Sequence, residues 1–323
     1  MDKKIFVGID GGGTKTTAAA FDAYGRFLAS QAGDSVNFCA LGTEKAGYNM
    51  KKIINGLCDK IGTDRFCSVF IGMSAIEDEA TDEQLSSLCG GIIRSDFIKM
   101  NSDLYAALEG MCESGECVFA VSGTGSMAIA KDRNGKIYTS GGWGFLLGDE
   151  GSGYDIASKG IKAAVRAVDP GGAKTLLTDA LYRYYGVNDL NGLTQVFYDP
   201  PMERSRIAAF CEAVCDCAED GDEAAVSILH SAAKAFSENV NLLIEKTGSK
   251  ILGIYGGVFE HSPLFVDIFS SYIKSGTEIR FPEFPPHIGA VIAAYKTAGA
   301  FSDEILKNIK NTYTDGKRNE QSC

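Results

Sequence analysis

Along the first part of the chain, apolar positions first alternate with polar ones and then recur at helical spacing. Runs with a period of two predict strands, whereas apolar positions three or four residues apart predict helices. The resulting order is βββαβαβα, with strands at 5–10, 16–22 and 26–31, a helix at 43–58, and then strand, helix, strand and helix at 67–72, 79–89, 97–100 and 103–111.

The same order begins again further along the chain, which predicts an internal repeat. Its strands are expected at 117–121, 126–131, 136–139, 251–255 and 278–281, with a helix after Pro263, a helix at 288–296 and a helical insertion at 150–245. The fold class is therefore α/β, with two tandem βββαβαβα lobes of the ribonuclease H-like, actin-like ATPase type and an insertion in the second. The expected boundaries are a first lobe at 1–115, a second lobe at 116–300, and a C-terminal helix and polar tail at 301–323 that cross back to the first lobe.

Composition narrows the partners of such a protein. With 323 residues and 45% hydrophobic content, the chain can bury two cores, so a cleft between two lobes is expected. A net charge of −11 disfavours nucleic acid and anionic membranes as partners. Ten cysteines without a signal-peptide pattern favour a reducing compartment over a disulfide framework, and no apolar run is long enough for a membrane helix. A cytoplasmic protein is expected.

A glycine turn follows the first predicted strand, in the run VGIDGGGTKT over residues 7–16. Gly11, Gly12, Gly13, Thr14 and Lys15 can wrap phosphates with backbone N–H groups, although a lone glycine turn is also typical of a plain hairpin. An acid at the end of a buried strand is costly unless it binds something, so Asp10 is expected to hold Mg²⁺. No GxxxxGK[ST] run is present, which excludes a P-loop.

The second repeat has a matching turn at the equivalent position. Gly123, Thr124 and Gly125 separate its first two predicted strands. Two such turns at equivalent places in an internal repeat favour phosphate binding over coincidence. We expect the two hairpins to clamp the phosphates of a nucleotide.

An acid also stands at a predicted strand-to-helix turn, in the segment Asn101, Ser102 and Asp103. Any of the three could cap the following helix, and spacing alone does not choose between capping and catalysis. Phosphoryl transfer needs a carboxylate that orients and deprotonates the attacking hydroxyl. Because Asp103 is the only acid so placed in the first lobe, it is the candidate general base.

The run GGWGFLLGDEGS over residues 141–152 contains the only tryptophan of the chain. Trp143, flanked by glycines, is suited to pack on the apolar face of a sugar. Asp149 or Glu150 can cap the next helix, and this role is compatible with ligand binding. Asn37 follows the third predicted strand and is a candidate amide donor to sugar hydroxyls.

Three motifs together, GIDGGGTKT, SGTGS and GGWGFLLGDEGS, resemble the N-acetylglucosamine kinase branch of the BadF/BadG/BcrA/BcrD ATPase family. The resemblance covers essentially the whole chain. It implies a kinase that uses ATP and Mg²⁺ to phosphorylate an amino sugar, with N-acetylglucosamine and its 6-hydroxyl first among the substrates. The same likeness alone implies a homodimer.

The resemblance also implies roles for individual residues. Thr14 and Thr124 would contact ATP, and Asp103 would be the catalytic base. The residues that would line the sugar are Asn37, Asp103, Ser126, Gly142, Trp143, Gly144 and Asp149. Gly256 and Gly257 match the glycine turn on the adenosine side, where Glu260 or His261 would lie beside the nucleotide.

Two positions depart from the family pattern. Met127 stands where the mammalian enzyme has an asparagine that touches the sugar, so the preferred sugar substituent is left open. Glu260 puts an acid beside the expected nucleotide. Glucosamine and N-acetylmuramic acid therefore remain alternative substrates.

Two other classes of protein share the superfamily. One comprises ATPases that activate 2-hydroxyacyl-CoA dehydratases or benzoyl-CoA reductase through a cluster bound by cysteines. Here the close-set cysteines Cys211, Cys215 and Cys217 fall in a predicted helix and are expected to be buried. The other comprises sugar-responsive repressors, which carry an N-terminal DNA-binding module. The predicted fold starts at Lys3 or Lys4, and the acidic chain disfavours DNA.

Overall fold

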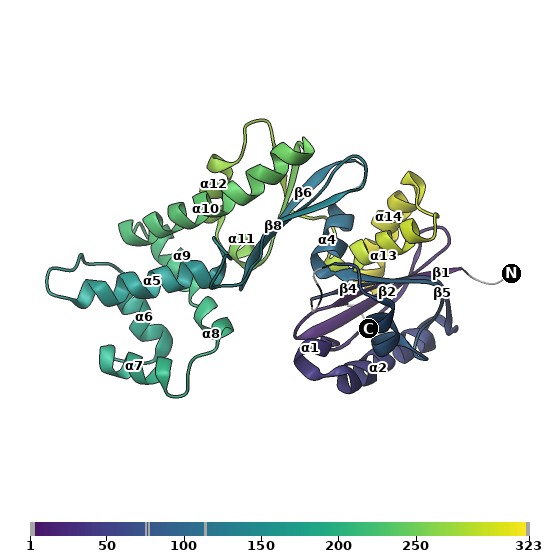
Figure 1. Cartoon of the computed structure of the whole chain (residues 1–323), viewed down its shortest axis with the longest axis horizontal. Helices are drawn as coiled ribbons and strands as arrows, with labels where there is room; N and C mark the ends of the chain where they lie inside the picture. The colour runs from purple at the N-terminus through teal and green to yellow at the C-terminus, as the bar shows by residue number, and fades with distance from the viewer. Residues whose placement is uncertain (1–3, 75, 77, 113–114, 321–323) are drawn as a thin grey trace. The chain divides into compact units, whose positions relative to one another are not determined.

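The computed structural model describes residues 4–74, 76, 78–112 and 115–320 (Figure 1). Two compact units make up the chain, one formed by Met1–Ser114 with Pro282–Cys323 and the other by Gly115–Phe281. Each unit contains a mixed sheet of five strands with helices packed against it. This confirms the predicted α/β fold class with two related halves.

In the first unit the strand order is β3-β2-β1-β4-β5. Strands β1, β2 and β3 form an antiparallel meander, whereas β4 and β5 are added in parallel to β1 through helical crossovers. The elements are β1 (Ile5–Gly11), β2 (Lys15–Asp22), β3 (Phe27–Asp34), α1 (Phe38–Leu41), α2 (Thr43–Ile61), β4 (Arg65–Met73), α3 (Asp82–Cys89), β5 (Arg94–Ser102), α4 (Asp103–Met111), α13 (Pro286–Thr297) and α14 (Asp303–Glu320).

The second unit repeats this topology, because its order β8-β7-β6-β9-β10 again places a meander beside parallel strands. Six helices between β8 and β9 form the expected insertion, and Figure 1 shows α6, α7 and α8 gathered around α5 and α9. The elements are β6 (Cys117–Ser122), β7 (Ser126–Lys131), β8 (Ile137–Gly141), α5 (Gly153–Val168), α6 (Leu177–Tyr185), α7 (Leu190–Tyr198), α8 (Arg204–Ala208), α9 (Cys211–Glu219), α10 (Glu223–Thr247), β9 (Ile251–Tyr255), α11 (Gly257–His261), α12 (Pro263–Tyr272) and β10 (Glu278–Arg280).

Helices α13 and α14 belong to the first unit. The sequence analysis assigned residues up to 300, and thus α13, to the second lobe, and expected only the C-terminal helix to cross back to the first. Close backbone packing explains the difference. A Cβ atom on Gly8 of β1 would lie 2.2 Å from the backbone nitrogen of Val291, so only glycine lets α13 approach the strand this closely. Helix α14 adds buried apolar side chains such as Leu306 and Ile309 to the same core.

The C-terminal helix is longer than expected. It runs to Glu320, whereas a polar tail was expected to begin at residue 314; positions 321–323 of that tail lie outside the described residues. None of the described helices is both long enough and apolar enough to cross a membrane.

Among the described residues, two cysteines form a disulfide and seven are free. Cys112 and Cys117 are disulfide-bonded, which differs from the expectation of reduced thiols. Cys211, Cys215 and Cys217 are free and buried in α9, as predicted for small apolar side chains.

The close approach at Gly8 gives a stability prediction. In Gly8→Ala the new methyl group meets the backbone of α13, which cannot move aside as a flexible side chain would. We expect the free energy of unfolding to fall by about 1 to 3 kcal/mol, measured by urea denaturation. Gly47→Ala in α2 is the matched control, because its nearest atoms are 3.9 Å away. A loss of stability no larger than in this control would contradict the packing argument.

Candidate active site

In the first unit, three parallel strands end side by side. Asp10 of β1 lies opposite Gly72 of β4, and Gly72 lies opposite Asn101 of β5. The carboxyl ends of parallel strands are the usual place for ligands in α/β sheets. Helix α4 starts directly after β5, so Asp103 is brought to the same edge of the sheet as Asp10.

The carboxyl group of Asp10 lies in an electrostatically unfavourable place. Burial and the nearby charge of Asp103 raise the pKa of Asp10 from 3.8 to about 6, against a smaller opposing effect of Lys15. Within the described part of the chain, no side-chain hydrogen bond or ion pair holds this carboxylate. A carboxylate in such a position is stabilised by a bound cation.

Asp103 is the first residue of α4, and the capping of this helix falls to its neighbour. The Ser102 hydroxyl accepts a hydrogen bond from the Tyr105 amide at 3.1 Å, which makes Ser102 the N-cap. One oxygen of Asp103 accepts from the Leu104 amide at 2.8 Å. Burial raises the pKa of Asp103, although hydrogen bonds from the Leu104 and Asp103 amides oppose the rise. The Asp103 carboxylate is therefore not needed as the cap of α4 and can take part in another interaction.

Helix α4 can approach the sheet because of Gly72. A Cβ atom at this position would lie 2.7 Å from the Cβ of Ala106 and 3.3 Å from the Cα of Asp103. Any larger residue in β4 would push the helix start outward. Gly72 thus helps to fix where Asp103 lies.

Asn37 is tied to the first glycine turn through one hydroxyl. Its side-chain oxygen caps α1 by accepting from the Ala40 amide at 3.0 Å, and its side-chain nitrogen donates to Ser74 Oγ at 3.1 Å. Ser74 in turn donates to the Gly11 carbonyl at 3.2 Å. The structure therefore places Asn37 near the turn, while Gly13, Thr14 and Lys15 are exposed at its tip.

In the second unit, two serines flank the glycine turn and hold the segment after β8. Ser122 Oγ donates to the Gly151 carbonyl and Ser126 Oγ donates to the Glu150 carbonyl, both at 2.7 Å. The turn itself accepts a hydrogen bond from the Gly153 amide at its Gly123 carbonyl, also at 2.7 Å. These bonds bring the turn at residues 123–125 and the run at residues 149–153 together.

Asp149 lies at the centre of this arrangement. Its side chain is 5% exposed, and its backbone has a left-handed φ of 62°. One carboxylate oxygen accepts from the Ser126 amide at 3.4 Å, and the other is paired with the guanidinium of Arg204. Sequence analysis missed Arg204, because nothing in the local pattern of the insertion links it to a motif 55 residues earlier.

Trp143 lies on the surface of the second unit, 70% exposed. Gly142 and Gly144 on either side have positive φ angles of 78° and 82°, a conformation that other residues rarely adopt. The side chain of Met127 packs against Gly142, where an added Cβ would lie 2.8 Å from its sulfur. The structure thus brings an apolar thioether next to Gly142, one of the residues predicted to line the sugar.

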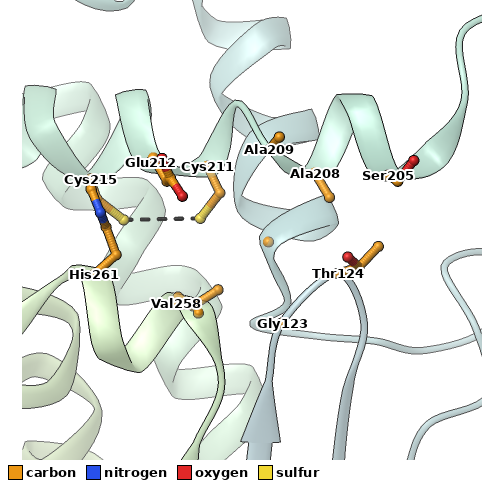
Figure 2. A pocket seen from close by; sticks show the side chains of 12 residues that line it. Gly123, Thr124, Ser205, Ala208, Ala209, Cys211, Glu212, Cys215, Val258 and His261 are labelled. Atoms are coloured by element: carbon orange, nitrogen blue, oxygen red, sulfur yellow. Dashed lines mark hydrogen bonds between the residues drawn. The ribbon is translucent and has the colours of Figure 1, made fainter. Parts of the chain in front are cut away.

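A cavity of about 300 Å³ opens beside the second glycine turn. Figure 2 shows Thr124, Val258 and His261 on its walls together with Cys211 and Cys215 from α9. The residues that line it include four of the predicted nucleotide ligands (Gly123, Thr124, Gly257 and His261) and eight that were not predicted to bind the nucleotide (Gly153, Ser205, Ala208, Ala209, Cys211, Glu212, Cys215 and Val258).

Gly256 directly precedes Gly257, which lines this cavity. Its φ is 109°, and an added Cβ would lie 2.4 Å from the Ser122 carbonyl oxygen, so the position requires glycine. His261 Nε2 lies 3.0 Å from a carboxylate oxygen of Asp216, which fixes the ring at the cavity edge. The predicted turn of Gly256 and Gly257 therefore lies next to the turn at residues 123–125.

Two of the cysteines of α9 lie close to each other in the core of the second unit. Cys211 and Cys215 have their sulfur atoms 4.0 Å apart, and the pKa of Cys211 is raised well above its ordinary value by the neighbouring thiol and by burial. Among the residues that the structure describes, no group of three or more histidine, cysteine or acidic side chains is arranged to hold a metal ion.

The sequence model of the BadF/BadG/BcrA/BcrD ATPase family matches residues 7–294. The chain belongs to this family. The match spans both glycine turns, Asp10, Asp103 and the run at residues 141–152. It confirms the family resemblance seen in the motifs.

Relatives with assigned activities cover nearly the whole chain. N-acetyl-D-glucosamine kinase of Dictyostelium discoideum is 31% identical over 91% of this chain and 98% of its own length. An N-acetylmuramic acid/N-acetylglucosamine kinase of Clostridium acetobutylicum is 28% identical over 84% of this chain and 90% of its own. The crystal structure of a candidate N-acetylglucosamine kinase from Chromobacterium violaceum has the same fold, with a TM-score of 0.70 at 19% identity over 90% of this chain and 98% of its own.

The raised pKa of Asp10 predicts how stability depends on pH. The folded protein holds this proton more tightly than the unfolded chain, so the contribution to stability is present below pH 3.8 and is lost as the pH rises toward 6. Above pH 6 the ionised group is a net cost. Asp10→Asn is therefore expected to raise the free energy of unfolding at pH 7 by about 1 to 3 kcal/mol without metal ions.

Urea denaturation with a chelator at pH 7 and near pH 4 measures this effect. The gain should shrink at the lower pH, where Asp10 of the wild type is largely protonated. Asp59→Asn on the exposed face of α2 is the control for a simple loss of negative charge. An equal gain at both pH values would contradict the assignment.

Proposed function

We propose that the protein is a kinase that transfers a phosphoryl group from ATP to an amino sugar, with the 6-hydroxyl of N-acetylglucosamine as the first candidate acceptor. The observation that carries the proposal is the pair of carboxylates, Asp10 and Asp103, at one strand edge of a chain related over nearly its whole length to amino sugar kinases. This pair supplies what phosphoryl transfer needs from a protein, namely a cation site and a base.

Nucleotide binding is proposed for backbone groups of both glycine turns and for the cavity of the second unit. Gly11 to Lys15 and Gly123 to Gly125 would offer N–H groups to phosphates, and Gly256, Gly257 and His261 would lie beside the adenosine. The cavity of about 300 Å³ suits a flat base and its ribose. Thr14 and Thr124 would contribute hydroxyl groups.

Mg²⁺ is the cation proposed for Asp10. It is commonly held by one or two carboxylates, with substrate phosphates and water completing its shell, so a cluster of three acids is not needed. Burial and the charge of Asp103 raise the pKa of Asp10, so a cation beside it would stabilise its ionised form. When bound, the ion would neutralise phosphate charge.

Asp103 is proposed as the general base. One oxygen of its carboxylate accepts a hydrogen bond from the Leu104 amide, and the other would take the proton of the attacking hydroxyl. Burial raises its pKa and makes it a stronger base than an exposed aspartate. Exclusion of water would limit the wasteful hydrolysis of ATP.

Sugar binding is proposed for Asn37 and for residues near the second glycine turn. These are Ser126, Gly142, Trp143, Gly144 and Asp149. Met127 replaces a polar contact by an apolar one beside Gly142, so glucosamine and N-acetylmuramic acid stay alternative acceptors. The likeness to amino sugar kinases is also the ground for proposing a cytoplasmic homodimer.

The reductase-activator function is disfavoured by the cysteines. Cys211, Cys215 and Cys217 are buried within α9, where they pack in the core of the second unit. A cluster shared between two chains would need exposed thiolates. The kinase is therefore the function that we propose.

The base assignment predicts the behaviour of Asp103→Asn. This variant keeps the shape of the side chain but cannot accept the proton, so kcat should fall by about 10²- to 10⁴-fold while the acceptor affinity changes little. The measurement is ADP release with Mg-ATP against a panel of amino sugars, run beside ATP alone. Asp82→Asn is the matched control, because Asp82 is also the first residue of a helix that follows its N-cap.

Two different outcomes would contradict two different parts of the proposal. A variant with near-normal turnover would contradict Asp103 as the base. A wild type that releases ADP equally fast without sugar would contradict the kinase itself.

The exposure of Trp143 predicts a selective effect of Trp143→Ala. Since the ring is 70% exposed, the melting temperature should not change, whereas KM for the sugar should rise by about 10- to 100-fold through lost packing. KM for ATP should stay constant. Leu147→Ala, 82% exposed in the same segment, is the control. An unchanged KM for every sugar tested would contradict the role of Trp143.

A further inference from the structure

We propose that Arg204 is a positioning residue that couples sugar binding to nucleotide binding. The inference rests on the proposed function, because it takes Asp149 as a sugar ligand and the cavity beside Thr124 as the nucleotide site. It concerns a residue of the helical insertion, outside the three motifs that carry the family resemblance. The contacts of Arg204 that carry the inference lie within the second unit.

One guanidinium nitrogen of Arg204 contacts both sites at once. Nη2 donates to the carbonyl oxygen of Thr124 at 3.3 Å and pairs with the carboxylate of Asp149. Both contacts converge over Gly125, where an added Cβ would lie 2.8 Å from this nitrogen and 3.0 Å from Asp149 Oδ2. A shift of the nucleotide turn therefore changes the position of the charge that balances Asp149.

Aromatic rings hold the guanidinium in this position. Its central carbon lies 5.3 Å from the ring centre of Phe145 and 5.9 Å from that of Tyr154, and the two rings are 5.0 Å apart. Its Nε is buried without a hydrogen-bond partner among the described residues. The contacts with the two rings restrain the Arg204 side chain, even though its Nε gives up a hydrogen bond to water.

The helix that carries Arg204 also lines the nucleotide cavity. Arg204 begins α8, and Ser205 and Ala208 of the same turn of helix lie on the cavity wall (Figure 2). An added Cβ on Gly153 would lie 3.0 Å from the Gly123 carbonyl and 3.3 Å from the Ala208 carbonyl, so the turn, α5 and α8 meet closely. A ligand in the cavity thus contacts the element that positions Arg204.

The ion pair joins the buried side chain of Asp149 to an Arg204 side chain that is 34% exposed, and it could have a structural role alone. The two roles give different results. Removing Arg204 leaves the buried carboxylate of Asp149 unpaired and lowers stability in either case. If Arg204 couples the two sites, the nucleotide changes the affinity for the sugar, and the sugar changes the affinity for the nucleotide by the same factor. If Arg204 has a structural role alone, its replacement leaves this factor unchanged.

The experiment measures that factor by calorimetry. N-acetylglucosamine is titrated into the full-length protein with and without Mg²⁺ and a non-hydrolysable ATP analogue. The wild type is expected to bind the sugar about 5- to 150-fold more tightly with nucleotide present. In Arg204→Ala the two affinities should agree within about twofold, whereas Arg204→Lys, which keeps the charge next to Asp149, should fold and show intermediate coupling.

Arg206→Ala is the matched control, since Arg206 is exposed two residues further along α8. It should keep the full coupling factor. A lysine variant that folds and keeps the wild-type factor, or a wild type whose sugar affinity ignores the nucleotide, would overturn the inference. Failure of the proposed function would look different, because the wild type would then bind or phosphorylate no amino sugar.

Discussion

The cost of burying a carboxylate organises both candidate sites. Asp149 is balanced within the chain, because Arg204 lies against it and the Ser126 amide donates to it. Asp10 lacks such a partner among the described residues, and the charge of Asp103 nearby makes its ionised form less favourable still. The second unit therefore balances the charge of its acid with a side chain of its own. In the first unit, no described side chain forms an ion pair with the buried acid.

Glycine determines how closely the backbone can approach at these places. At Gly72 the lack of a side chain lets α4 bring Asp103 to the strand edge, and at Gly256 it lets β9 turn beside Ser122. The two sheets share one topology, so each unit presents a turn after its first strand. The two units differ in the helices that pack near this turn. Helices of the insertion line the cavity of the second unit, whereas α13 packs directly on β1 of the first.

Sequence could predict the features that depend on local pattern. The order of strands and helices, the two glycine turns and the position of Asp103 at a strand-to-helix turn all follow from periodicity and turn residues. Arg204 could not be predicted, because its partners are set by how the insertion folds back. The unit to which α13 belongs could not be predicted either. Its apolar residues suit either core, and only the contact at Gly8 decides between them.

In the proposed reaction, the γ-phosphoryl group of ATP passes to a sugar hydroxyl and not to water. Single-turnover transfer from labelled ATP, with the product identified by ³¹P and ¹³C NMR, tests it most directly. The account predicts an amino sugar 6-phosphate as the main labelled product, with inorganic phosphate a minor one. Label that appears only as inorganic phosphate, whichever amino sugar is supplied, would contradict the account.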